Sequence, residues 1–345
     1  MAGAAAAHSR FIGVEADMTQ NATMAGETTL SGIRLVGESV VFREALRRIE
    51  RIAPYDVPVL IEGETGTGKE LAARAVHALG PRRRRAFVPL NCGTLPDALI
   101  ESELFGHTRG AFTDAREAKG GLVAAAEGGT LFLDEVDSLS SRGQVALLRL
   151  LQDREYRPVG GRAPLKADIR IVAATNTALD AAVARGCFRE DLLFRLRVLT
   201  VTMPPLRERA QDVKLLARSF LAQFAAEYGR PAPRLTEETE GAIASYAWPG
   251  NVRELENRLL SAFLLAEAEV PLRLPGLEAS RRPDDTGLFR EARARTIAEF
   301  ERRYLTTLLR RVGGNMSRAS REAGKERSSL IRLVRKHGLK RDDFA

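Results

Sequence analysis

Short apolar runs alternate with helical stretches between Ile33 and about Pro205. The runs read as strands buried on both faces, and amphipathic segments such as Phe42–Ile52 and Gln144–Gln152 read as helices that separate them. This alternation predicts an α/β domain with a doubly wound parallel sheet. The expected strands are Val59–Glu62, Phe87–Asn91, Thr130–Asp134, Ile169–Thr175 and Val198–Met203.

The pattern becomes purely helical after the last of these strands. Asp212–Tyr228, Thr236–Tyr246 and Val252–Ala266 predict a small helical lid, so we expect an α/β subdomain over residues 33–205 and a lid over 206–272. A stretch rich in proline and charge, 273–290, reads as a linker, and a final helical module occupies 291–345. Residues 1–32 lack the basic start and apolar core of a signal peptide, so we expect a flexible leader.

Composition narrows the class of protein. The 345 residues are 44% hydrophobic and 28% charged, which is typical of a soluble protein of two or three domains. No apolar run approaches the roughly 20 residues of a membrane helix, so we expect no membrane partner. Only Cys92 and Cys187 are present, too few for a disulfide framework, which favours a reducing, cytoplasmic setting and packing roles for both.

The net charge of +8 is concentrated near the end of the chain. Residues 310–345 hold eleven Lys and Arg against four Asp and Glu, so +7 of the net charge lies there. A basic segment of this density favours nucleic-acid binding, although a solvated charged helix is an alternative.

The most specific motif is a glycine-rich turn between a strand and a helix. It consists of Gly63, Glu64, Thr65, Gly66, Thr67, Gly68 and Lys69. Backbone N–H groups and a helix N-terminus at such a turn surround phosphate, and Lys69 can reach the outer phosphates, so the motif predicts a P-loop. Glu70 stands where a Ser or Thr usually offers a hydroxyl to Mg²⁺. A glycine-rich turn by itself is often only a turn, but the flanking strand and helix favour nucleotide binding.

Two adjacent carboxylates follow a later buried strand. Asp134 and Glu135 would lie at its carboxyl end, where open α/β sheets bind ligands. Asp134 would hold Mg²⁺ directly or through water, and Glu135 would polarise the attacking water. An isolated pair could simply be solvated acids; together with the P-loop it predicts an NTP hydrolase site.

Two further positions could contact the nucleotide. Thr175 and Asn176 end the next strand and could contact the terminal phosphate or orient the water, although a strand-end Asn is often a turn former. Arg253 lies in the first turn of a lid helix, where the helix dipole does not favour a cation. We therefore expect Arg253 to contact nucleotide phosphate.

Arg189 and Arg195 lie on a short helix that follows the strand ending at Thr175. An arginine inserted into another subunit's nucleotide site stabilises the transferring phosphoryl group and accelerates the reaction by about 10³–10⁵. Because Glu190 and Asp191 are adjacent, a salt-bridged surface helix is an equally open alternative.

The last module has the form of a helix-turn-helix. Met316–Ala323 forms the first helix, Gly324 the turn, and Ser328–His337 a second helix that would enter the major groove of DNA. We expect base contacts from Arg327, Ser328, Ser329 and Arg332, and phosphate contacts from Arg335, Lys336 and Lys340. A basic helical hairpin that binds nothing is the alternative.

These motifs together resemble the bacterial enhancer-binding proteins, AAA+ ATPases that activate sigma-54 RNA polymerase. The resemblance covers about Ile33 to Leu339, and Glu103–His107 followed by Gly110–Thr113 is similar to the family's sigma-contacting loop. It implies contact of that loop with sigma-54, by Phe112 and Thr113 above all; the loop residues are Gly110, Ala111, Phe112, Thr113, Asp114 and Ala115. A P-loop with Glu after its Lys, as at Glu70, is also the family's form.

The resemblance assigns roles to residues already singled out. Asn91 becomes a switch that hydrogen-bonds Glu135, and Arg253 becomes the second sensor of nucleotide. Thr175 and Asn176 become the first sensor, and Arg189 and Arg195 become fingers that act on a neighbouring subunit. The resemblance further implies ATP and Mg²⁺ as cofactors, a homo-oligomer from dimer to hexamer, and a Fis-type helix-turn-helix on enhancer DNA.

Three departures from the family pattern stand out. Asp114 occupies a loop position where Gly is usual, and a Cβ there restricts the backbone. Lys325 stands where an apolar residue is common in the Fis-type module. Only about 30 residues precede the ATPase region, so we expect control from a separate partner, from expression level or from a domain outside this sequence.

The sequence thus predicts a sigma-54-dependent activator that couples ATP hydrolysis in a ring to remodelling of the closed polymerase complex. A rival is a DNA-binding regulator that acts without sigma-54, with the ATPase fold as a nucleotide-gated scaffold. Asp114 is its support, whereas the intact hydrolytic set opposes it. A helicase or clamp-loader-like remodeller is disfavoured by the Phe112-Thr113 loop and the basic tail.

Overall fold

The computed structural model describes two stretches of the chain. They are residues 27–277, apart from 31, 95, 113, 114, 116, 267–270, 275 and 276, and residues 301–337, apart from 302, 303, 307, 314 and 326. The chain forms two compact units, residues 1–277 and 278–345. Within the described ranges, no helix is both long and apolar enough to cross a membrane.

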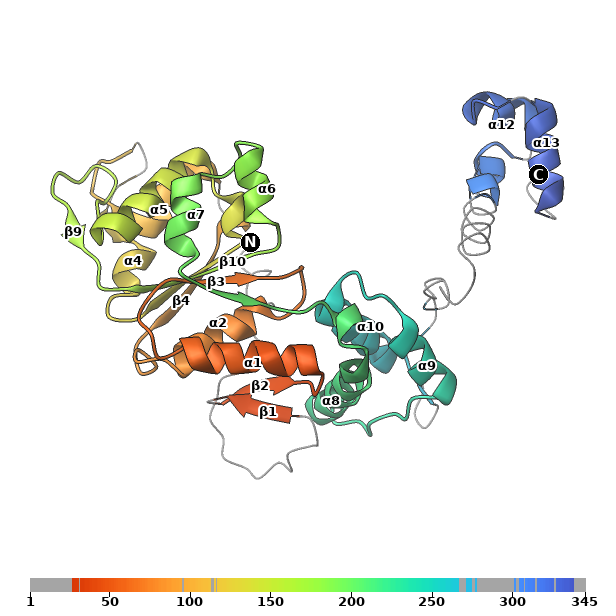
Figure 1. Cartoon of the computed structure of the whole chain (residues 1–345), viewed down its shortest axis with the longest axis horizontal. Coiled ribbons are helices and arrows are strands. Elements are labelled where there is room, and N and C mark those ends of the chain that lie inside the picture. Colours follow the sequence, from red (N-terminus) through yellow and green to blue (C-terminus); the bar gives the residue numbers. More distant parts are fainter. Residues whose placement is uncertain are drawn as a thin grey trace. The chain divides into compact units, whose positions relative to one another are not determined.

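Five parallel strands form the central sheet of the first unit, in the order β11-β3-β10-β7-β4 (Figure 1). Their bounds are β3 Val59–Glu62, β4 Phe87–Asn91, β7 Thr130–Asp134, β10 Arg170–Thr175 and β11 Leu199–Thr202. All five predicted strands are present, and their ends shift by at most one residue. Pro89 is accommodated because β4 is an edge strand.

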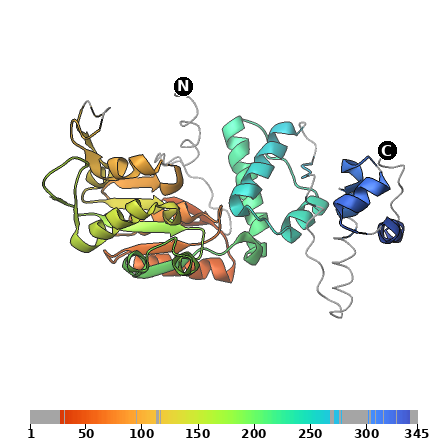
Figure 2. The same cartoon turned by 90° about the horizontal axis from the view of Figure 1, so that it is seen from above.

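Helices cover both faces of this sheet (Figures 1 and 2). Alternate residues of a strand face opposite sides, so Leu131 and Leu133 join one apolar core while Phe132 joins the other. The helices are α1 Val40–Ile52 and α2 Lys69–Ala78 on the Phe132 face, and α3 Asp97–Phe105, α4 Leu122–Ala125, α5 Ser141–Asp153, α6 Leu179–Ala184 and α7 Glu190–Leu196 on the other. This is the doubly wound α/β fold that the sequence predicts.

Three antiparallel hairpins were not predicted. Residues 27–30, expected in the leader, form β1 Glu27–Leu30, which pairs with β2 Ile33–Val36. The other two hairpins are β5 Gly106–His107 with β6 Lys119–Gly120, and β8 Glu155–Tyr156 with β9 Leu165–Lys166. Strands of two residues carry too little alternation to be read from sequence. Three 3₁₀ turns complete this part: η1 Cys92–Thr94, η2 Val136–Ser138 and η3 Leu206–Glu208.

The lid consists of α8 Ala210–Tyr228, α9 Glu237–Ser245 and α10 Asn251–Leu265. Its core surrounds Trp248, which is fully buried and donates from Nε1 to the carbonyl oxygen of Ile243 at 2.8 Å. The described lid contains no strand, as expected, but Leu235 and Leu272 form an isolated bridge.

A buried carboxylate fastens the lid to the start of α1. Asp212 accepts hydrogen bonds from the backbone N–H groups of Glu38 and Ser39, from the Ser39 hydroxyl and from Arg209. Burial tends to raise the pKa of Asp212, but these hydrogen bonds prevail and lower it. The charged carboxylate therefore stabilises the folded arrangement.

The second unit contains the predicted helix-turn-helix, α12 Met316–Glu322 and α13 Arg327–Lys336. Asn315 caps the start of α12, because its side-chain oxygen accepts from the N–H groups of Ser317 and Arg318. Gly324 makes the turn that follows this helix, with a φ of 59°. Residues 304–306 and 308–311 are also helical and supply Leu305, Leu308 and Leu309 to the core of this unit.

Candidate active site

The P-loop lies between β3 and α2, as predicted. Gly66 and Gly68 have φ values of 78° and 94°, which other residues adopt only with strain. A Cβ at Gly68 would meet no atom within 4 Å, so this side of the loop is open to a ligand. The Lys69 ammonium is folded over the loop and donates to the carbonyl oxygens of Gly63 at 2.8 Å and Glu64 at 3.1 Å.

Asp134 and Glu135 face this lysine from the end of β7. Burial lowers the pKa of Lys69, whereas the nearby charges of Asp134 and Glu135 raise it. Burial raises the pKa of Asp134, and Lys69 opposes that shift. Glu135 has a φ of 53°, an unusual value for a residue with a side chain and one that often marks functional sites. The two acids and the P-loop lysine therefore form one electrostatic cluster.

Asn91 lies beside these acids, but its hydrogen bond differs from the expected one. In the parallel register Asn91 is opposite Asp134. Its side-chain oxygen accepts from the N–H of Gly93 at 2.8 Å, and no hydrogen bond among the described residues joins it to Glu135. A Cβ built at Gly93 would lie 2.6 Å from Glu135 Oε2 and 3.3 Å from Asn91 Oδ1, so both side chains lie close to Gly93. A hydrogen bond to the Glu135 carboxylate would use the NH₂ group of Asn91 and not this oxygen, because a carboxylate only accepts.

Thr175 and Asn176, which were expected to form the first sensor together, make different contacts. Asn176 Nδ2 donates to Thr65 Oγ1 at 3.3 Å, so it reaches the P-loop. Thr175 is fully buried; its Oγ1 donates to Asp137 at 2.7 Å, and its carbonyl oxygen accepts from the N–H of Gly63 at 3.2 Å. Asn176 is therefore placed to contact a nucleotide, whereas Thr175 joins the end of β10 to η2.

The lid contributes to the same site through the first turn of α10. The N–H of Val252 donates to the carbonyl oxygen of Gly66 at 3.0 Å, and a Cβ at Gly66 would lie 3.1 Å from Arg253 Cβ. The charge of Arg253 also lowers the pKa of Lys69. Arg253, predicted to contact phosphate, thus lies next to the P-loop.

Asn251 is a buried polar residue beside the P-loop that the sequence did not single out. It is fully buried with a φ of 52°, and its Nδ2 donates to Thr65 O at 2.9 Å and to Glu64 Oε2 at 3.2 Å. Its Oδ1 accepts from the N–H of Leu206 at 2.7 Å, at the start of η3. Arg207 adds a two-pronged ion pair to Glu64, both contacts at 2.7 Å. One hydrogen-bonded network therefore joins the P-loop, η3 and the lid.

The expected fingers lie on α7. Arg189 immediately precedes this helix and forms a two-pronged ion pair with Asp191, at 3.0 and 2.7 Å. Arg195 is exposed and makes no ion pair in the described part of the chain. In this single subunit neither is hydrogen-bonded to the P-loop. The neighbour-directed role of both arginines stays a prediction.

The expected sigma-54 loop is the tip of the β5–β6 hairpin. The N–H of Gly110 donates to the carbonyl oxygen of Ala115 at 2.8 Å, and that of Ala115 to Phe112 at 3.0 Å. Phe112 is 40% exposed, with its ring 4.8 Å from that of His107. Thr113 and Asp114 lie outside the described residues. The β8–β9 hairpin supports the loop: a Cβ at Gly160 would lie 2.9 Å from Ala111 Cβ.

Part of the expected DNA-contacting surface is described on α13. Ser328 and Arg332 are exposed, and Ser329 is half-buried. Lys336 is exposed but paired with Glu301 at 2.9 Å, beside a contact of His337 with the same carboxylate. The side chains of Arg327 and Arg335 lie outside the described residues, and so does Lys340.

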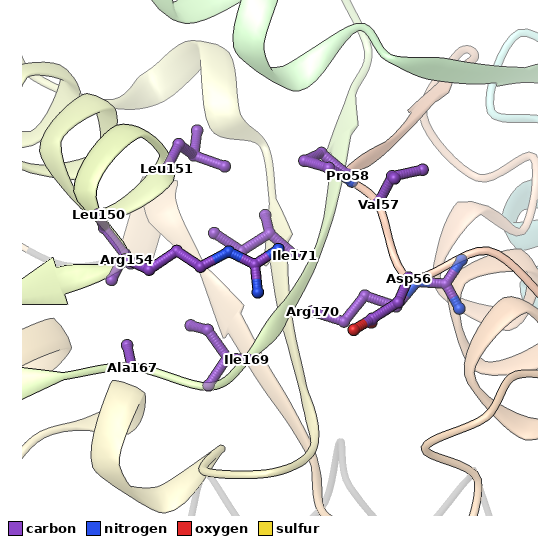
Figure 3. A pocket seen from close by; sticks show the side chains of 10 residues that line it. All are labelled: Asp56, Val57, Pro58, Leu150, Leu151, Arg154, Ala167, Ile169, Arg170 and Ile171. Carbon is purple, nitrogen blue, oxygen red and sulfur yellow. The ribbon is translucent and has the colours of Figure 1, made fainter.

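A separate cavity of about 70 Å³ lies at the other end of the sheet (Figure 3). Pro58 and Arg170 line it, and they lie at the amino ends of β3 and β10, whereas the P-loop follows a carboxyl end. Arg170 is buried and donates to the carbonyl oxygen of Ala53 at 2.9 Å. This cavity is thus distinct from the nucleotide site.

Fold and site together define a P-loop ATPase with a helical lid. A family model of the sigma-54 interaction domain matches residues 35–202, and one of the AAA+ ATPase lid domain matches residues 207–282. The transcriptional regulatory protein ZraR of Klebsiella oxytoca is 42% identical over 313 residues, which cover 88% of this chain and 69% of that protein. The DNA-binding transcriptional regulator NtrC of Salmonella typhimurium is 40% identical over 349 residues, covering 94% and 74%.

A solved structure agrees with these relatives. NtrX from Brucella abortus in complex with ATP has a TM-score of 0.67 and 34% identity, over 88% of this chain and 69% of that one. The chain belongs to the family of sigma-54-dependent transcriptional activators and carries their AAA+ ATPase domain. The resemblance seen in the sequence is thereby confirmed.

Proposed function

We propose that the cluster around Lys69 hydrolyses Mg²⁺-ATP and that subunits of this chain, assembled in a ring, use the energy to open sigma-54 RNA polymerase complexes. The observation that carries the proposal is the convergence of Lys69 at the P-loop, Asp134 and Glu135 at the end of β7, and Arg253 of the lid. A chain that used the fold only as a scaffold would not need the water-activating carboxylate.

Each residue has a distinct role in the proposed reaction. The loop N–H groups and Lys69 bind the β- and γ-phosphates, and Arg253 contacts them from the lid. Glu135 accepts a proton from the attacking water, and Asn176 helps to orient that water.

Asp134 fits a magnesium ion that is shared with phosphate. Its Oδ1 accepts from the N–H of Glu135 at 3.0 Å, and no hydrogen bond from the described residues reaches Oδ2. Proteins commonly hold Mg²⁺ by one or two carboxylates together with substrate phosphates. When bound, the ion would neutralise charge on the phosphate oxygens.

Arg189 and Arg195 would complete the nucleotide site of a neighbouring subunit. Both are exposed, and Arg189 is held by Asp191, which a phosphate could displace. We infer a homo-oligomeric ring, a hexamer by resemblance to the family. This arrangement makes hydrolysis dependent on assembly.

The nucleotide state would reach the sigma-54 loop along α3. Asn91 ends β4, η1 follows at once, and α3 leads directly into β5 and the loop at 110–115. Donation from the Asn91 NH₂ group to the Glu135 carboxylate in another nucleotide state would shift the start of this segment. Loops that respond to the γ-phosphate commonly switch in this way.

The C-terminal unit would hold the ring on enhancer DNA. Ser328 and Arg332 lie exposed on α13, and most of the chain's net positive charge lies in this unit. Such a helix fits the major groove.

Mixing two inactive variants tests the shared active site. Lys69→Ala has a defective nucleotide site but keeps Arg189 and Arg195. Arg189→Ala keeps an intact nucleotide site but lacks the arginine that would enter a neighbouring site. In a random equimolar ring about a quarter of the interfaces would pair a sound pocket with a sound finger. Recovery of ATP hydrolysis toward a quarter of the wild-type rate supports the proposal. A mixture that is no more active than the two separate variants, at every mixing ratio, contradicts it.

A further inference from the structure

Gln144 is a buried amide whose hydrogen bonds join two parts of the catalytic machinery. It lies in the first turn of α5 and is 2% exposed. Its Nε2 donates to the carbonyl oxygens of Leu139 at 2.9 Å and Cys187 at 3.0 Å, and its Oε1 accepts from the N–H of Arg189 at 2.9 Å. These partners fix the orientation of the amide, because two carbonyl oxygens require the NH₂ group and an N–H requires the oxygen.

The hydrogen bond from Gln144 to Leu139 leads back along the chain to Glu135, the water-activating carboxylate. The N–H of Ser138 donates to the carbonyl oxygen of Glu135 at 2.9 Å, and that of Leu139 to Val136 at 3.3 Å. The segment between Glu135 and the Gln144 amide is therefore a continuous hydrogen-bonded turn. A shift of the backbone at Glu135 would be transmitted to the Leu139 carbonyl.

The other end holds the finger. Cys187 and Arg189 flank Phe188, which is buried, and Arg189 directly precedes α7. Apolar residues of α5 and α7 share one core, but hydrophobic contacts are non-directional. The hydrogen bonds of Gln144 have defined directions, so they set where the finger segment lies along α5.

We propose that Gln144 is a positioning residue that aligns Arg189 with the hydrolytic carboxylates of its own subunit. The position of Arg189 in the nucleotide site of a neighbouring subunit then depends on the state of the nucleotide site in the subunit to which Arg189 belongs. The inference rests on the neighbour-directed fingers of the proposed function. It goes beyond them by assigning the coupling between a subunit's pocket and its finger to one amide.

Gln144→Leu removes all three hydrogen bonds while nearly preserving side-chain volume. Gln152→Leu is the matched control, because Gln152 is exposed near the end of the same helix. Since a finger is worth about 10³–10⁵ in rate, misplacing it should lower kcat of the Gln144→Leu ring at least tenfold. Gln152→Leu should hydrolyse ATP like the wild type.

Mixing experiments then locate the defect. Gln144→Leu mixed with Lys69→Ala should regain activity, because sound fingers meet the intact pockets of Gln144→Leu. Gln144→Leu mixed with Arg189→Ala should stay inactive, since neither supplies a positioned finger. Recovery in the first mixture also demonstrates that the variant is folded and binds ATP.

Three results would overturn the inference. They are wild-type activity of Gln144→Leu alone, recovery with Arg189→Ala instead of Lys69→Ala, and no recovery with either partner. The mixture of Lys69→Ala with Arg189→Ala runs in parallel. If that mixture recovers activity while Gln144→Leu gives one of these three results, the positioning role fails and the shared site stands; if that mixture itself stays inactive, the shared site fails.

Discussion

The side-chain amide of Asn251 donates a hydrogen bond to the backbone carbonyl oxygen of Thr65 at 2.9 Å, so the lid is joined directly to the P-loop. The same amide reaches Glu64 and the N–H of Leu206. A movement of α10 relative to the sheet would therefore change the shape of the phosphate-binding loop.

Asn251→Asp should weaken ATP binding without unfolding the lid. The substitution keeps the oxygen that accepts from Leu206 but places a carboxylate oxygen against two acceptors. Losing a buried donor costs about 1–3 kcal/mol, so the Kd for ATP should rise by roughly tenfold or more. Titration with a fluorescent ATP analogue measures it, with Asn257→Asp, exposed on the same helix, as the control. An unchanged Kd would mean that the lid does not shape the loop.

Phe112→Ala should separate ATP hydrolysis from sigma-54 binding. Phe112 is 40% exposed at the hairpin tip and contacts His107, and none of its described contacts involves the nucleotide cluster. We expect near wild-type hydrolysis but loss of sigma-54 capture in the presence of an ATP transition-state mimic. Tyr55→Ala, another exposed aromatic, should capture sigma-54 normally. Capture by Phe112→Ala equal to wild type would remove Phe112 from the interface.

Arg332→Ala and Lys336→Ala should affect DNA binding in different ways. Arg332 is exposed and makes no ion pair in the described part of the chain, so its loss should reduce discrimination between sites by about 1–3 kcal/mol. Lys336 is paired with Glu301, so its loss should weaken all sites alike and only slightly. Binding to specific and random DNA at several salt concentrations checks both; identical losses on the two DNAs for both variants would contradict the division.

The sequence predicted the sheet well because its strands are buried on both faces. Leu131, Phe132 and Leu133 form an unbroken apolar run, and the motif residues follow directly from the strand ends. The P-loop, the acids of β7 and Arg253 could therefore be placed without coordinates. The short hairpins could not, since two-residue strands leave no periodic pattern.

The network residues were not predictable for a different reason. Asn251 and Gln144 are single polar residues on helices, and their partners lie far away in sequence, as in the contact between Asn251 and Glu64. Nothing local distinguishes such a side chain from a solvated one. The expected hydrogen bond between Asn91 and Glu135 is not found among the described residues, where Asn91 Oδ1 accepts from the N–H of Gly93, so the switch role of Asn91 stays a prediction.

Asp212→Asn should destabilise the chain in a pH-dependent manner. Asp212 is fully buried and paired with Arg209, and removing one charge of such a pair costs about 3 kcal/mol or more. Because the folded-state pKa is lowered, this stability is present above the ordinary carboxyl pKa of about 4 and is lost as pH falls through the folded value.

Urea unfolding at pH 7 and at a pH well below 4 measures this difference. The gap between wild type and Asp212→Asn should be largest at pH 7 and smaller at the acidic pH. Asp180→Asn, which breaks an exposed pair with Arg197, should change stability little at either pH. A gap that is constant with pH would show that the charge of Asp212 is not what stabilises the lid.

The central claim is that hydrolysis at Glu135 drives the opening of sigma-54 polymerase. The most direct measurement is open-complex formation on a sigma-54 promoter, with wild type and Glu135→Gln compared at saturating ATP. Glu135→Gln keeps the shape of the side chain but cannot accept a proton from water. We predict that it binds ATP and captures sigma-54 yet forms no open complex, while wild type opens the promoter. Opening by Glu135→Gln at the wild-type rate, or failure of wild type to open it, would contradict the account.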